Sequence, residues 1–181
     1  MAPTAHSTSG SHLVIDKTWD GQPIPETEQV RVELALDAAN LNLEVVSPYY
    51  ADPPPAGAPG HTERLWEHEV VELFLLGDAQ RYLEIEFGPH GHYLALLLHG
   101  ARKVEQVVEL DRYEAQIEAG SWRGVASVSR TLLPAGIRRG NACAIHGVGQ
   151  CRRYLSTYPL PGARPDFHRL DCFGALALTS F

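Results

Sequence analysis

The sequence predicts an all-β protein, an antiparallel β-sandwich of about nine strands. Its apolar residues alternate with polar ones or form short continuous runs, and no long stretch follows the period of an amphipathic helix. The 16 glycines and 13 prolines among 181 residues indicate many turns. Short strands separated by turn residues are typical of antiparallel sandwiches, so these features together favour that class.

The first strands are predicted on both sides of a tight turn. VRVELAL (30–36) and LNLEVVS (41–47) alternate apolar and polar residues, and the DAAN between them predicts a hairpin turn. The proline-rich segment 48–61 cannot form a helix and predicts an ordered surface loop. EVVELFLL (69–76) is almost continuously apolar, which predicts a central strand buried on both faces.

A second hairpin, YLEIEFGPHGHY (82–93), follows that central strand. GPHG (88–91) has proline second and glycine fourth, as a four-residue type I turn prefers. A hairpin closed by that turn pairs Glu86 with Tyr93, which places Tyr93 on the same face as Glu84 and Glu86. Carboxylates, phenols and apolar groups mix on this face, which is typical of a small-ligand surface. The alternative is the solvated side of an antiparallel sheet.

The later part of the chain completes the predicted sandwich. Five further short segments predict strands: RKVEQVVEL (102–110), YEAQIEAG (113–120), GVASVSRTLLP (124–134), NACAIHGVG (141–149) and DCFGALAL (171–178). A chain of this length suits one domain with a sizeable core, so residues 13–181 are predicted to form a single domain. Residues 1–12 are rich in small and hydroxyl-bearing residues without periodicity and predict a flexible tail.

Composition excludes several classes of partner. The net charge of -7 and the lack of Lys and Arg clusters argue against nucleic acid and against anionic membranes. No apolar run approaches the length of a membrane span, and the first residues lack the apolar core of a secretory signal, so a cytoplasmic protein is expected. The three cysteines match no zinc motif, and we interpret them as structural thiols.

Glu72 is the most informative single residue, because it lies within the apolar strand 69–76. A buried carboxylate is costly unless it is paired or hydrogen-bonded, so Glu72 requires a partner. A ligand hydroxyl is one such partner. The equally weighted alternative is a structural ion pair with Arg81, Arg102 or Arg153.

Histidines supply a catalytic alternative. His146 or His168, together with Asp166 or a nearby glutamate, could act as an acid and base pair near neutral pH. Arg153, with Tyr154 beside it, lies in the proline-rich stretch 150–168 and could clamp an anionic substrate. His146 sits in an otherwise apolar strand, however, where a hydrogen-bonded core histidine is the commoner role.

No metal site or enzyme signature is predicted. The histidines lack the spacing of known metal motifs, and the sequence contains no GxSxG, P-loop or GxGxxG motif. Whether the protein is an enzyme is therefore left open by the sequence.

Several longer strings resemble a known family. LWEHEVVELFLL (65–76), YLEIEFGPHGHYLALLLHG (82–100) and RPDFH (164–168) resemble a small family of uncharacterised proteins, also present in vertebrates, that carries only an open-reading-frame name. More distantly, the tryptophan-plus-strand pattern resembles DOMON-like domains and carbohydrate-binding modules of family 9. That resemblance implies a β-sandwich that binds a sugar or haem, with Trp66 as a stacking platform. Haem-binding DOMON-like domains are similar to one another in using a Met and a His as the two haem ligands. Met1 is the only methionine of this sequence, so no cofactor is predicted.

The leading functional hypothesis is a small-ligand-binding β-sandwich whose ligand is a small polar molecule, sugar-like by resemblance. The alternatives are a small enzyme with the acid and base pair above or with a metal site, and a protein interaction module. The sequence leaves the oligomeric state open. The predicted ligand-binding residues are Trp66, Glu72, Glu84, Glu86, Tyr93, Arg153 and Tyr154.

Overall fold

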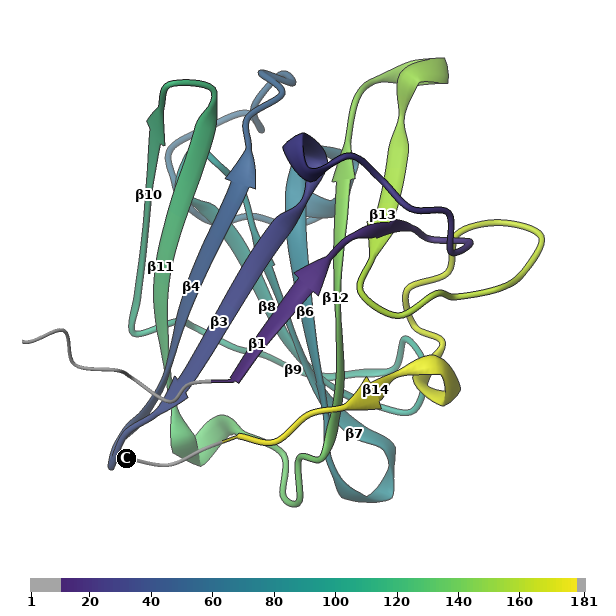
Figure 1. Cartoon of the computed structure of the whole chain (residues 1–181). Coiled ribbons are helices and arrows are strands. Elements are labelled where there is room, and N and C mark those ends of the chain that lie inside the picture. Colours follow the sequence, from purple (N-terminus) through teal and green to yellow (C-terminus); the bar gives the residue numbers. More distant parts are fainter. Residues whose placement is uncertain (1–10, 179–181) are drawn as a thin grey trace, which may run out of the picture.

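The computed structural model describes residues 11–178, which form two facing β-sheets (Figure 1). The predicted all-β sandwich is confirmed. The first sheet has the order β1-β3-β4-β11-β10. Its strands are β1 (Ser11–Ile15), β3 (Val30–Leu36), β4 (Asn40–Pro48), β10 (Arg112–Glu118) and β11 (Ser121–Ser129). All neighbours in this sheet are antiparallel.

The second sheet has the order β2-β13-β12-β6-β7-β8-β5, with β14 beside β12 and β9 beside β8. Its strands are β2 (Lys17–Thr18), β5 (Gly60–His61), β6 (Val70–Leu76), β7 (Arg81–Phe87), β8 (His92–His99), β9 (Val104–Val107), β12 (Arg139–His146), β13 (Arg153–Ser156) and β14 (Gly174–Ala175). Only the two-residue contact between β5 and β8 is parallel among the pairings of the described strands. The helices are single 3-10 turns: η1 (Glu26–Glu28), η2 (Leu65–Glu67), η3 (Asp78–Gln80), η4 (Arg130–Leu132), η5 (Gly149–Cys151) and η6 (Leu170–Cys172).

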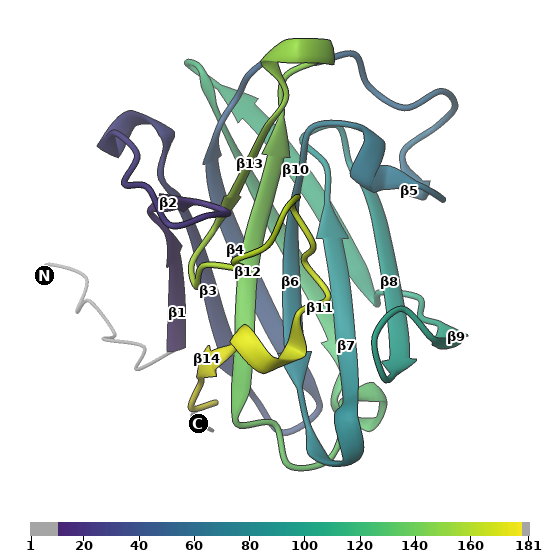
Figure 2. The same cartoon turned by 90° about the vertical axis from the view of Figure 1, so that its right-hand side faces the viewer.

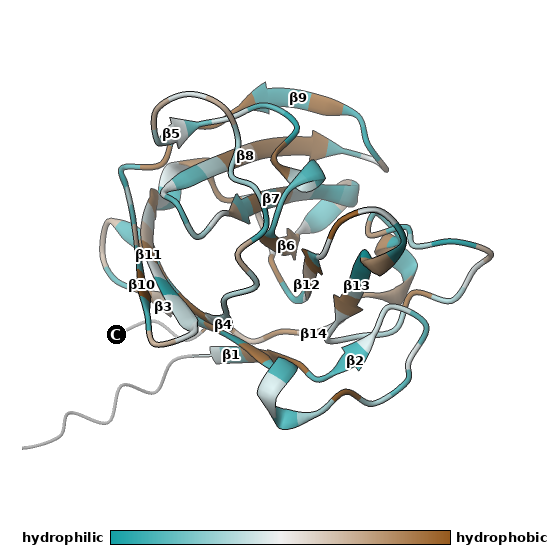
Figure 3. Ribbon diagram, turned by 90° about the horizontal axis from the view of Figure 1, so that it is seen from above, coloured by the Kyte–Doolittle hydropathy of each residue, from teal (hydrophilic) through white to brown (hydrophobic). Residues whose placement is uncertain are grey.

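The main core fills the space between the two sheets. In Figure 3 the strands β1, β3, β4 and β11 run along one side and β12, β6, β7 and β8 along the other. Alternation puts Val32 and Leu34 of β3 inside, while Arg31 and Glu33 face solvent. Trp122 of β11 is also buried there. Full burial of each large apolar side chain contributes roughly 1.5–3 kcal/mol, so this layer supplies most of the stability.

A second apolar layer covers the outer face of the second sheet. The prediction that β6 is buried on both faces is confirmed, because its side chains point alternately into the main core and into this outer layer. Residues 157–173 run across the outer face, in front of the sheet in Figure 2, and bury Leu160, Phe167 and Phe173. Asn141 of β12 fixes the start of this segment: its side chain exchanges two hydrogen bonds with the backbone of Tyr158 (3.1 and 3.0 Å).

The predicted register of the second hairpin is wrong by one residue. Phe87 pairs with Tyr93, and Glu86 pairs with Leu94. The turn is present, with the Gly91 N–H donating to the Gly88 carbonyl, but the Gly88 N–H also donates to the carbonyl of the residue after Gly91. Gly91 takes a left-handed conformation (φ 82°) and adds a one-residue bulge. That shift turns Tyr93 to the inner face of the sheet, away from the two glutamates.

Four short strands, β1, β2, β5 and β13, have no counterpart in the sequence prediction. β13 lies inside the stretch 150–168 that was predicted as a loop, and it forms because β12 offers it a pairing edge. The predicted tail 1–12 lies mostly outside the described residues. Its last two residues, Ser11 and His12, are not a tail, because they pair with β3 as the start of β1.

The proline-rich loop after β4 has no regular structure up to β5 and is tied to the sandwich by side chains. Glu69 accepts hydrogen bonds from the backbone N–H groups of Tyr50 (3.1 Å) and Asp52 (3.3 Å). Asp52 in turn accepts from the N–H of Gly147 (2.6 Å). Within residues 11–178 no helix is long and apolar enough to cross a membrane.

Candidate functional site

A pocket of about 380 Å³ opens on the outer face of the second sheet. Strands β6, β7, β8, β12 and β13 form its floor, η2 forms one wall, and the turn after β8 and the segment 165–168 form the other. Its lining residues are Trp66, Glu72, Glu84, Leu96, Leu98, Arg102, Val104, Ile145, Tyr154, Pro165, Asp166, Phe167 and His168.

Three glutamates share the outer face of β6 and β7. Glu72 on β6 lies directly opposite Glu86 on β7. Glu84 lies two residues before Glu86 on β7, diagonal to Glu72. Their exposed fractions are 3%, 0% and 3% for Glu72, Glu86 and Glu84. Glu72 Oε1, Glu84 Oε2 and both carboxyl oxygens of Glu86 have no hydrogen-bond partner within residues 11–178. Buried polar atoms without partners are rare in folded proteins, so each one needs an explanation, such as a functional role.

Burial changes the protonation of these glutamates. Loss of hydration raises the pKa of Glu84 from 4.5 to about 8, against the lowering effect of Arg102. Loss of hydration, reinforced by repulsion from Glu84, also raises the pKa of Glu72 well above its ordinary value. The pKa of Glu86 is raised well above its ordinary value by burial and by the charges of Glu72 and Glu84. At neutral pH the floor of the pocket therefore holds protonated carboxyl groups, which can both donate and accept hydrogen bonds.

Trp66 forms the wall beside the glutamates. The η2 turn is anchored from below by Leu65, which is completely buried, so Trp66 is left 43% exposed. Arg152 holds this turn in place, because its guanidinium donates to the carbonyls of Trp66 (2.5 Å) and Glu67 (3.0 Å). The indole is thus a large apolar surface on a fixed turn.

The opposite wall is a hydrogen-bonded network. Arg102 donates two hydrogen bonds to Asp166 (2.7 and 3.2 Å), and Asp166 accepts another from the N–H of His168 (3.0 Å). His168 Nδ1 lies 2.7 Å from the hydroxyl of Tyr82, which also accepts from the N–H of Arg102 (3.1 Å). His168 Nδ1 is 4.0 Å from Glu84 Oε2. The network fixes segment 165–168 over the glutamates.

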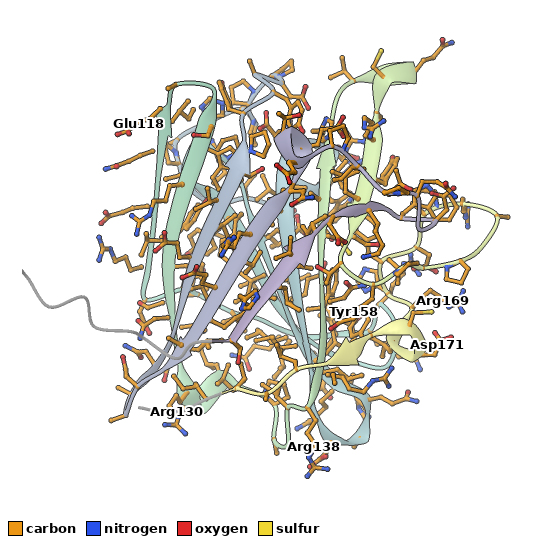
Figure 4. The ribbon with its side chains drawn as sticks, viewed as in Figure 1. Glu118, Arg130, Arg138, Tyr158, Arg169 and Asp171 are labelled. Atoms are coloured by element: carbon orange, nitrogen blue, oxygen red, sulfur yellow. The ribbon has the colours of Figure 1, made fainter. Side chains whose placement is uncertain are left out.

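This segment is also braced from its far end. Figure 4 labels Arg169 and Asp171 at the outer edge of the molecule, where the two side chains form an ion pair (2.8 Å). Arg169 also donates to the carbonyl of Pro161 (2.8 Å), which closes the loop on itself. The segment that covers the pocket is therefore held at both ends.

The structure brings together some of the predicted site residues. Trp66, Glu72, Glu84, Tyr154, Asp166 and His168 line the pocket, and Glu86 lies next to Glu72 on the same face.

Three predicted residues lie elsewhere. Tyr93 faces the inner core and donates to Glu109 (2.5 Å), because of the register shift described above. Arg153 forms an ion pair with Glu28 (2.7 Å) outside the pocket lining. His146 lies on the inner face of β12 and stacks on Tyr50 (centroids 3.5 Å apart), so it cannot pair with Asp166 on the outer face.

The predicted structural arginine partner of Glu72 is also wrong. Arg81 pairs with Glu105, Arg102 with Asp166 and Arg153 with Glu28, and no ion pair among the described residues includes Glu72. Each arginine finds a more exposed carboxylate, which costs less desolvation than the buried Glu72.

Sequence reasoning missed Arg102, Phe167 and the leucines of β8 as lining residues. The correct register would have revealed Leu96 and Leu98, because they share the face of Glu84. Arg102 reaches the lining from the turn after β8, where its backbone is left-handed (φ 62°). A single sequence does not show that Arg102 takes this conformation. Within the described part of the chain, no group of three His, Cys, Asp or Glu residues could hold a metal ion.

Comparison with known proteins decides the family. No protein-family model matches the sequence. The UPF0462 protein C4orf33 homolog of Danio rerio is 38% identical over 175 residues, which cover 92% of this chain and 88% of the zebrafish protein. The chain belongs to the UPF0462 family. The resemblance to an uncharacterised family found in vertebrates is thereby confirmed.

A solved structure shares the fold of this UPF0462 member. The crystal structure of a "putative carbohydrate-binding protein" from Bacteroides uniformis aligns with a TM-score of 0.70 at 17% identity, over 94% of this chain and 86% of that one. A family 9 carbohydrate-binding module from Caldicellulosiruptor kristjanssonii, in complex with glucose, aligns with a TM-score of 0.45 at 14% identity, over 84% and 77% of the two chains.

Proposed function

We propose that the pocket binds a small polyhydroxylated molecule of the carbohydrate class. The observation that carries this proposal is that Glu72 Oε1 and Glu84 Oε2, buried in the pocket lining, have no hydrogen-bond partner within residues 11–178. Sugar hydroxyls donate and accept hydrogen bonds, as protonated carboxyl groups do, so the two sets complement each other. Leaving those oxygens unpaired costs roughly 1–3 kcal/mol each, and a bound ligand would recover it.

The rest of the pocket suits the same ligand class. A ligand pocket usually has apolar and aromatic walls with a few fixed polar groups, and volumes upward of roughly 300 Å³ are typical. Trp66 supplies an exposed indole on which the apolar face of a sugar ring can lie, and Tyr154 and Phe167 extend that surface. The Bacteroides uniformis protein with the same fold carries a description that agrees with this class.

Titration calorimetry with neutral and amino monosaccharides and disaccharides tests the proposal. We expect at least one sugar to bind, and Trp66→Ala to weaken its affinity about tenfold or more, equivalent to about 1.4 kcal/mol. Val148→Ala is the matched control, because Val148 is an exposed apolar residue outside the pocket lining. The proposal is wrong if no sugar binds, or if Trp66→Ala leaves every measured affinity unchanged.

A second candidate function is acid and base catalysis in the same pocket. Burial lowers the pKa of His168 to about 4, so at neutral pH its imidazole can accept a proton, while Glu84, 4.0 Å away, still holds one that it can donate. Release of nitrophenol from nitrophenyl glycosides by the wild-type protein, lost in His168→Ala, would support this candidate. Sugar binding without turnover of any such glycoside would contradict it.

A further inference from the structure

The charge balance of the pocket is unusual for a site of its size. Glu72 and Glu84 line it, Glu86 adjoins Glu72, and all three side chains are buried. Within residues 11–178, the only ion-pair contact of any of them is the 4.0 Å approach of His168 Nδ1 to Glu84. A buried carboxyl group ionises readily only beside a positive group, and within residues 11–178 none of these three has one close enough for a strong ion pair, so a bound cation would let Glu72 or Glu84 ionise.

The basic groups around the pocket are already occupied. Arg102 donates two hydrogen bonds to Asp166, and the opposite charges of the two side chains cancel, so this pair adds no net charge. The guanidinium of Arg152 donates to backbone carbonyls, those of Trp66, Glu67 and Gly147. His168 shares its Nδ1 with the hydroxyl of Tyr82. Arg152 lowers the pKa of Glu72 through its charge, but that pKa remains well above its ordinary value, and no ion pair among the described residues includes Glu72.

We infer that the ligand carries a protonated amine, as an amino sugar does, and presents it to Glu72 and Glu84. This inference rests on the proposed function, because it assigns the ligand class of the same pocket. Diagonal neighbours on adjacent strands lie within reach of one bound group. An ammonium group has three N–H donors, which fit the unpartnered Glu72 Oε1 and Glu84 Oε2.

The aromatic walls favour the same group. A cation near the face of a Trp or Tyr ring is attracted by the ring electrons, and the attraction grows when the site excludes water. Trp66, Tyr154 and Phe167 line the same pocket as Glu72 and Glu84. A bound ammonium group would lower the raised pKa values of Glu72 and Glu84 and favour the ionised form of at least one of them, whereas an anionic ligand would keep both protonated.

Calorimetric titration with glucosamine, glucose and N-acetylglucosamine at about pH 6.5 tests the inference. The three probes share the sugar ring, and of these only glucosamine carries a positive charge. We expect glucosamine to bind about tenfold more tightly than glucose, because charge-assisted hydrogen bonds are about twice as strong as neutral ones. Glu72→Gln and Glu84→Gln should each remove most of this preference while glucose still binds.

Glu33→Gln is the matched control, since Glu33 is an exposed glutamate on the other sheet and its loss should leave the preference intact. Thermal unfolding of each variant separates a binding effect from misfolding. Equal or tighter binding of glucose, or a preference that survives in both pocket variants, overturns the inference and leaves the proposed function standing. Binding of none of these or other sugars overturns the proposed function and the inference together.

Discussion

Glu72 on β6 lies directly opposite Glu86 on β7, and both side chains are buried against the outer face of the same sheet. Opposed like charges on neighbouring strands destabilise a sheet, so this pair costs the fold least while at least one carboxyl group stays protonated. Glu84 adds a third carboxyl group beside them. The pocket floor therefore connects ligand binding, protonation and stability.

Stability should fall as the pH rises above neutrality. The folded protein holds a proton on Glu84 up to about pH 8, whereas the unfolded chain releases it near the ordinary value of 4.5. Between these values the folded state binds more protons, so the free energy of unfolding decreases as the pH rises. The total decrease is roughly a few kcal/mol. Glu72 and Glu86, whose pKa values are also raised, act in the same direction.

Urea denaturation of the wild type and Glu84→Gln between about pH 7 and about pH 8.5 measures this slope. The lower limit avoids His168, which acts in the opposite direction only between about 4 and its ordinary value of 6.5. Glu84→Gln should flatten the decline, and the control Glu33→Gln should keep the wild-type slope. A wild-type stability that is constant or rises across this range would contradict the prediction.

Tyr82→Phe should destabilise the fold by about 0.5–1.5 kcal/mol, since it removes two part-buried hydrogen bonds. Tyr82 is completely buried, and its hydroxyl joins His168 Nδ1 to the N–H of Arg102. The change in urea midpoint measures the loss. Tyr154→Phe is the control, because the Tyr154 hydroxyl has no hydrogen-bond partner in the described part of the chain; an equal effect of both variants would refute the role given to Tyr82.

The ion pair between Arg102 and Asp166 should contribute a coupling energy of about 0.5–1 kcal/mol, near the upper end for exposed pairs, because it is bidentate. A double-mutant cycle with Arg102→Ala and Asp166→Ala, followed by urea denaturation, isolates this energy. We expect the coupling to shrink at high salt, since both side chains are partly exposed. Strictly additive single variants would show that the pair contributes nothing.

Gly91→Ala should destabilise the second hairpin by about 1–2 kcal/mol, because alanine is strained in the left-handed backbone conformation of Gly91. Steric contact of the new Cβ atom should add to this loss. A Cβ atom at Gly91 would lie 3.1 Å from Pro59 Cβ. Gly120→Ala is the matched control, because Gly120 has a similar φ (83° against 82°) and no atom within 4 Å of a Cβ built there. Thermal unfolding compares the two, and a smaller loss for Gly91→Ala than for Gly120→Ala would be inconsistent with this packing.

The sequence alone determined the sandwich and much of its inventory of strands. Alternation in 30–36 and the continuous apolar run of 69–76 are local signals, and the structure places β3 and β6 there. The buried Glu72 was also recognisable, because a single carboxyl group inside an apolar strand is visible in the sequence. These features depend on residue type and spacing, which one chain records directly.

Only the tertiary structure decided which residues meet. Because of the bulge at Gly91, the register of β8 differs by one residue from the predicted pairing. Tyr93 therefore lies on the opposite face from the site, since a one-residue shift exchanges the two faces of a strand. β13 exists only because β12 offers it an edge. Arg102 lies 64 residues from its partner Asp166, and His168 lies 86 residues from its partner Tyr82. The fold alone brings each pair together. Such contacts depend on the path of the whole chain, which local sequence patterns do not encode.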